Sequence, residues 1–146
     1  MTRRRDDAGT AIVEVTWLTL LLLVPLIYLL LSVFQMQRAA FGVDAATRAA
    51  GRAYVLAPDV ATAEQRAARA AAVAMADQGI ALGADALSIS CAPTPDACLQ
   101  PGSVVTVTLD AQVRLPLVPD LFGDFEPTAR VSGEHQVPYG TFREAR

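Results

Sequence analysis

Residues 9–34 read GTAIVEVTWLTLLLLVPLIYLLLSVF, and this stretch decides the architecture of the 146-residue chain. Within it, Val15–Phe34 carries no charged side chain. A helix of that length spans about 30 Å, which matches the hydrocarbon core of a bilayer. The sequence therefore predicts a transmembrane helix over residues 10–35, preceded by a cytoplasmic leader over residues 1–9. Pro25 lies inside the span and is expected to kink the helix without ending it.

A cleaved secretory signal is the alternative to a retained anchor. The apolar region of a signal peptide is shorter, about 7–15 residues, and is followed by small residues at the cleavage site. Here the span ends in Ser32, Val33 and Phe34, which form a poor site of that kind. The sequence therefore favours a retained, single-pass anchor.

Arginines on the two sides of the span bear on its orientation. Arg3–Arg5 precede the span closely, whereas Arg38, Arg48 and Arg52 follow it more sparsely. Basic residues concentrate on the cytoplasmic side of a membrane. The N-terminus is therefore expected in the cytoplasm, and residues 36–146 are expected on the extracytoplasmic side of the cell membrane.

The two cysteines support the same orientation. Cys91 and Cys98 flank the segment APTPDA, whose two prolines favour a short loop that holds the two thiols together. The pair predicts a disulfide, which forms in an oxidising compartment outside the cytoplasm. The alternative is two separate thiols in a reducing compartment. A metal site is not expected, because two cysteines and one distant histidine supply too few ligands.

The rest of the chain predicts an α+β fold. Residues 35–57 extend the span into an Ala-rich stem, with an apolar face that includes Met36, Ala40 and Val43. A second helix follows, with Thr62 expected at its N-cap and Gly79 at its C-terminal end. Alternating patterns then predict a small antiparallel sheet covered by the helices, with strands near residues 87–91, 104–115 and 129–137.

Composition and motifs exclude most catalytic functions. The net charge of −3 argues against nucleic-acid binding, which requires a basic patch. The chain has one histidine and carries no phosphate-binding loop and no nucleophile elbow. We therefore expect no catalytic residues and no cofactor, and a structural role in place of an enzymatic one.

Glu14 lies inside the apolar run, five positions after Gly9. Burying a carboxylate at that depth in hydrocarbon is energetically unfavourable, so its presence indicates a functional role. A membrane peptidase needs a small residue such as Gly9 at its cleavage site, and cleavage there gives Thr10 a free amine. The Glu14 carboxylate of one subunit would then pair with the amine of a neighbour during assembly, which offsets its burial. The alternative is that Glu14 extends toward the lipid headgroups without any role in assembly.

Residues 9–53 resemble the N-terminus of TadE-like proteins, the minor pseudopilins of tight-adherence (Flp-type) pilus systems. The resemblance implies a pilin-like fold and cleavage between Gly9 and Thr10 by a prepilin peptidase, with Glu14 as the family's acidic position. It implies partnership with other pilins or pseudopilins, and with an inner-membrane assembly platform and its secretion ATPase. The chain departs from the family at Val15, where an aromatic residue commonly follows the glutamate.

Two alternatives remain open: an uncleaved single-pass extracytoplasmic adaptor, and a secreted binding domain that signal peptidase releases. A further candidate for contact with a partner is the apolar loop that follows the middle strand. It either folds over the sheet as a lid or presents Leu121, Phe122 and Phe125 to a partner.

Overall fold

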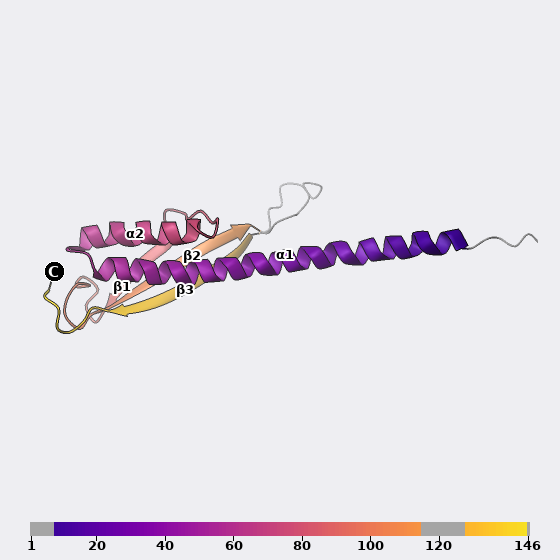
Figure 1. The fold of residues 1–146 in the computed structure, drawn as a ribbon. Coiled ribbons are helices and arrows are strands. Elements are labelled where there is room, and N and C mark those ends of the chain that lie inside the picture. Colours follow the sequence, from indigo (N-terminus) through magenta and orange to yellow (C-terminus); the bar gives the residue numbers. More distant parts are fainter. Residues whose placement is uncertain (1–7, 115–127, 146) are drawn as a thin grey trace, which may run out of the picture.

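The computed structural model describes residues 8–114 and 128–145 of the chain. It confirms the α+β fold class, with helices and strands in the order that the sequence predicts (Figure 1). Helix α1 covers Ala8–Val55 and helix α2 covers Val60–Ala76. The strands are β1 at Leu87–Ala92, β2 at Val104–Arg114 and β3 at Thr128–Pro138.

The three strands form one antiparallel sheet in the order β1-β2-β3. The register places Leu87 opposite Leu109 and Leu109 opposite Gly133. Along β2 the odd-numbered residues from Val105 to Val113 are buried, whereas their even-numbered neighbours are half-buried or exposed. Because side chains alternate between the two faces of a strand, one face of the sheet lies against the core. The residues of β3 on this face are half-buried: Ala129, Val131, Gly133, His135 and Val137.

Helix α1 packs against α2 on one side and against β2 and β3 on the other, so both helices lie on the same side of the sheet (Figure 1). The approach is close because small residues form the contacts. A Cβ added to Gly51 of α1 would lie 2.6 Å from Cγ2 of Val137, and one added to Gly133 of β3 would lie 2.6 Å from Cγ1 of Val43. The buried alanines of the two helices are Ala39, Ala46, Ala50, Ala63, Ala67 and Ala71.

Helix α1 continues without a break from the apolar stretch into the domain, and it ends at Val55, two residues before the expected end of the stem at residue 57. The position of its buried face differs slightly from the expected one. Ala40 is exposed and Ala39 is fully buried, whereas Val43 is buried as predicted. The buried positions therefore start one residue earlier, because the contacts with α2 and the sheet fix which side of the helix faces inward.

The N-cap of α2 is Asp59, and the expectation of Thr62 at this position is wrong. The Asp59 carboxylate accepts a hydrogen bond from the backbone N–H of Thr62 at 2.8 Å and another from the Thr62 hydroxyl at 2.8 Å. A carboxylate with two oxygens satisfies both donors, and its negative charge is favourable at a helix N-terminus. The helix therefore begins at Val60, directly after this residue.

The C-terminal end of α2 follows the predicted pattern at Gly79. This glycine has φ of +71°, a left-handed conformation in which a residue without Cβ is unstrained. The N–H of Gly79 donates to the carbonyl of Ala76, and the N–H of Ile80 donates to the carbonyl of Met75. These are the two hydrogen bonds of a Schellman motif, and Ile80 packs against the core as that motif requires.

Candidate functional site

The N-terminal part of α1 is a candidate membrane anchor. Among the described residues, α1 is the one helix long and apolar enough to cross a bilayer, and no residue of its most apolar 18-residue window is buried. Large side chains such as Leu22 are 62% exposed there, because none of the described helices and strands packs on them. Exposed apolar surface of this extent is unfavourable in water, so this segment requires lipid or partner helices around it.

Three aliphatic hydroxyl groups of this segment are satisfied within the helix. Thr16, Thr19 and Ser32 each donate a hydrogen bond to the carbonyl four residues earlier, at 2.8, 2.7 and 2.9 Å. A donor without a partner would cost several kcal/mol in hydrocarbon. These three side chains are therefore compatible with a lipid environment.

Helix α1 continues through Pro25. Proline has no N–H, so it cannot donate to the carbonyl of Leu21, and its ring crowds that carbonyl. The helical turns on both sides of Pro25 are nevertheless intact. A bend at this position stays a prediction.

The predicted cleavage site and Glu14 lie in the first turns of α1. The helix begins at Ala8, so Gly9 and Thr10 are its second and third residues. Glu14 is exposed about one turn further on, and none of the described side chains forms an ion pair or a hydrogen bond with it. Its partner in a membrane must therefore come from water, from a lipid headgroup or from another chain.

The character of α1 changes over a few residues at its junction with the domain. Phe34 is 60% exposed, Gln35 is half-buried and Ala39 is fully buried. Large apolar side chains thus give way to small buried ones within about one and a half turns. The expected boundary between residues 35 and 36 lies inside this transition.

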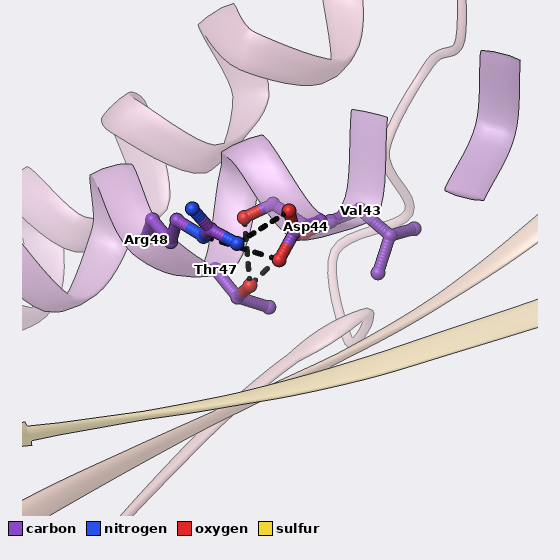
Figure 2. A network of polar contacts seen from close by, with 4 residues as sticks. All are labelled: Val43, Asp44, Thr47 and Arg48. Atoms are coloured by element: carbon purple, nitrogen blue, oxygen red, sulfur yellow. Dashed lines mark hydrogen bonds and ion pairs between the residues drawn. The ribbon is translucent and has the colours of Figure 1, made fainter. Parts of the chain in front are cut away.

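A polar network lies on α1 within the domain (Figure 2). The buried Thr47 hydroxyl donates to the carbonyls of Val43 and Asp44, both at 3.1 Å. Arg48 forms a two-point ion pair with the Asp44 carboxylate, at 2.8 Å between Nη2 and Oδ2 and 3.1 Å between Nε and Oδ1. The pair is half exposed, so it contributes only a few tenths of a kcal/mol. These side chains are satisfied by one another and hold no position open for a ligand.

Two arginines bind the C-terminal carbonyls of the two helices. Arg38 on α1 donates from Nη2 to the carbonyl of Gln78, just after α2, at 2.7 Å. Arg143 in the C-terminal segment donates from Nη1 to the carbonyl of Val55, the last residue of α1, at 2.6 Å, and lies over the Tyr139 ring. A cation at a helix C-terminus is favourable because the carbonyls there carry partial negative charge.

Cys91 and Cys98 form the expected disulfide, with their Cα atoms 5.3 Å apart. The bond closes the connection between β1 and β2, and both cysteines are buried. The Ser103 hydroxyl, on the same connection, hydrogen-bonds to the carbonyls of Cys98 and Gln100. The disulfide is therefore part of the core at the end of the domain far from the apolar segment.

The partner-loop residues Leu121, Phe122 and Phe125 lie outside the described residues. Within residues 8–114 and 128–145, no three His, Cys, Asp or Glu side chains come close enough to hold a metal ion.

Glu134 and His135 lie on opposite faces of β3, as their adjacent positions predict. Burial raises the pKa of the Tyr54 phenol, and the negative charge of Glu64 raises it further.

Sequence reasoning missed the roles of Asp59, Arg38 and Arg143. Asp59 precedes the helix by one residue and was therefore available as a cap in the sequence. Arg38 and Arg143 bind carbonyls 40 and 88 residues away, and no local pattern marks such pairs. No protein-family model, no curated protein and no solved structure matches this chain.

Proposed function

We propose that this protein is a structural component, a minor pseudopilin, of a tight-adherence type IV pilus-like secretion system. Its N-terminal helix anchors it in the cell membrane, and a prepilin peptidase cleaves it between Gly9 and Thr10. Its partners are other pilins or pseudopilins and an inner-membrane assembly platform with its secretion ATPase. The N-terminus lies in the cytoplasm and the α+β domain outside it.

One observation carries this proposal: a single helix of 48 residues has an exposed apolar first part and a second part that belongs to the core of a small domain. A subunit of this shape is able to move between a bilayer and a helical bundle, because both surround the apolar part with hydrocarbon. An independent soluble function does not require this exposed segment.

The position of Glu14 supports the same function. After cleavage, the new amine of Thr10 would lie one helical turn before Glu14. Because Glu14 has no partner among the described residues, it is available to the amine of a neighbouring subunit. Such a pair forms only at one relative height of two helices and therefore sets their register.

The continuity of α1 favours a retained anchor over release by signal peptidase. A cut near residue 40 would fall inside the helix, next to the buried residues Ala39, Gly42 and Val43. A product that begins at residue 40 would lack the fully buried Ala39, which belongs to the folded domain.

The mass of the N-terminus tests the proposal. The full chain is expressed with and without its host's prepilin peptidase, extracted from membranes and analysed by mass spectrometry. We expect a start at Thr10 only when the peptidase is present, and retention of the leader in Gly9→Val, since a branched side chain blocks the cleavage site. Thr10→Ala is the matched control and is cleaved normally.

Two outcomes would contradict the proposal. A start at Met1 or Thr2 under both conditions would identify an uncleaved adaptor. A soluble product that begins near residue 40 would identify a secreted domain.

A further inference from the structure

Three segments that are far apart in the sequence meet at the end of the domain opposite the apolar helix (Figure 1). They are the connection between β1 and β2, which holds the disulfide, the turn between α1 and α2, and residues 139–145, which we call the C-terminal strap. The strap contains no helix and no strand. Its position is therefore set by its contacts with the other two segments.

Tyr139 joins the strap to the connection between β1 and β2. Its N–H donates to the carbonyl of Ser103 at 2.8 Å, and the N–H of Gly102 donates to the carbonyl of Tyr139 at 3.2 Å. The Tyr139 side chain is buried, and its hydroxyl donates to the carbonyl of Glu144 at 2.9 Å. Tyr139 thus fixes the first residue of the strap and folds the end of the strap back toward its own ring.

Arg143 joins the strap to the end of α1. Its Nη1 donates to the carbonyl of Val55 at 2.6 Å, and its guanidinium lies 5.3 Å from the centre of the Tyr139 ring. The last carbonyls of a helix have no partner within the helix and attract a cation. The strap is therefore held at one end by the connection between β1 and β2 and at the other by α1.

The disulfide fixes the part of the connection that holds the strap. Cys98 is bonded to Cys91, and its carbonyl accepts a hydrogen bond from the hydroxyl of Ser103, which is buried. Residues 93–103 contain no helix and no strand, so many backbone conformations are open to them once the covalent bond is removed. A continuous path of contacts thus leads from Cys98 through Ser103 to the strap and on to α1.

We propose that this path is a redox-sensitive device, in which oxidation of Cys91 and Cys98 docks the C-terminal strap on the end of α1. In this step the two thiols lose two protons and two electrons and form the S–S bond, and the disulfide of an exported thiol oxidase is reduced to a dithiol. The inference rests on the extracytoplasmic location proposed above, because that compartment supplies the oxidant. The strap is open on the reduced chain in the cytoplasm and closes after export.

Hydrogen exchange of the full chain in detergent tests the proposal. Exchange is followed by mass spectrometry in the oxidised chain and after reduction with dithiothreitol, and labelling of the thiols confirms the reduction. We expect the amides of Gly102 and Tyr139 to exchange about tenfold faster or more in the reduced chain, because the constraint on the connection is lost. The amides of α2, which contacts neither cysteine through a hydrogen bond, should keep their exchange rates.

Three variants separate the covalent bond from the contacts that follow it. Cys91→Ser combined with Cys98→Ser should show fast exchange in the strap with or without reductant. Ser103→Ala keeps the disulfide but removes the hydroxyl that binds Cys98, so the strap should exchange faster even in the oxidised chain. Ser90→Ala is the matched control, because this exposed serine next to Cys91 has no hydrogen bond from its side chain among the described residues. Where the double cysteine variant does not fold, the reduced chain and Ser103→Ala decide the result.

Two outcomes of the exchange experiment overturn the inference. Equal exchange of the strap in the oxidised and reduced chains would show that the disulfide does not control it. Equal acceleration in the strap and in α2 would show that the disulfide stabilises the whole domain and has no particular effect on the strap.

Alkylation of thiols in intact cells separates these outcomes from a failure of the proposed location. We expect Cys91 and Cys98 to be protected from alkylation until a reductant is added. Free thiols in cells, together with a strap that responds to reduction in detergent, would overturn the extracytoplasmic location and with it the closing of the strap after export.

Discussion

The two parts of α1 belong to one continuous helix and differ in what surrounds them. In the first part, large side chains such as Leu22 are exposed. In the second, small side chains such as Ala46 are completely buried. Most of the large apolar side chains of α1 therefore lie outside the protein core. The surface of α1 that packs on protein consists mainly of alanines, with Val43 and Tyr54 among them, whereas the surface left for lipid consists mainly of leucines.

The largest expected effect comes from placing charge in the first part. Leu22→Arg combined with Leu26→Arg should release the chain from the membrane fraction, because each arginine near the centre of a span costs about 3 kcal/mol. The measurement is extraction of membranes with alkaline carbonate, followed by detection of the chain in the pellet.

The matched control changes two residues of equal exposure outside the apolar part. Leu22 and Leu26 are 62% and 54% exposed, whereas Val73 and Leu56 are 63% and 58% exposed. Val73→Arg combined with Leu56→Arg should leave the chain in the pellet, because these side chains face water. The same behaviour of both double variants would show that lipid does not surround the first part of α1.

An intermediate effect is expected from enlarging the second part. Ala46→Leu should destabilise the domain by about 1–3 kcal/mol, since its added carbons have no space between α1 and its neighbours. Ala45→Leu, at the adjacent exposed position, should change stability little. Near-UV circular dichroism of the full chain in detergent follows the buried Tyr54 and Tyr139 during melting. Equal melting temperatures for the two variants would contradict close packing at Ala46.

The smallest effect is expected at Asp59, where α2 turns back along α1. Hydrogen bonds from the backbone and side chain of Thr62 lower the pKa of the Asp59 carboxyl group. Because this pKa is lower in the folded state, the cap stabilises fully above the unfolded pKa of about 4. That stabilisation is lost as the pH falls through the lower, folded value.

Acid melts of three proteins test this cap. Asp59→Ala should melt at a lower temperature than the unchanged chain at neutral pH, with the difference shrinking below about pH 4. Asp59→Asn keeps an oxygen that accepts from the Thr62 N–H, so it should remain close to the unchanged chain at neutral pH. It should lack the part of the acid-dependent loss that Asp59 causes. A constant difference between Asp59→Ala and the unchanged chain at every pH would refute the role of the charge.

The sequence predicted the elements whose pattern is local. The alternation along Val105–Val113 depends only on neighbouring residues, and the structure confirms which face is buried. Gly79 likewise marked the end of α2, because few other residues tolerate its backbone conformation. Features that depend on two distant segments were not predictable, such as the burial of Ala39 in place of Ala40 and the bonds of Arg38 and Arg143 to distant carbonyls. The N-cap at Asp59 is local and was open to prediction from the sequence. The processing frame at Gly9 and Glu14 stays a prediction, since cleavage is a chemical event and leaves no trace in the fold.

The continuity of α1 across the junction has a mechanical consequence. The helix is unbroken between Phe34 and Val55, so the domain rotates and shifts together with the end of the apolar segment. Each residue of helix corresponds to a rotation of about 100° and a rise of 1.5 Å. One residue inserted between Phe34 and Ala39 would therefore point the sheet in a different direction around the helix axis. The number of residues between the apolar segment and the domain therefore sets the direction in which the sheet faces around the axis of α1.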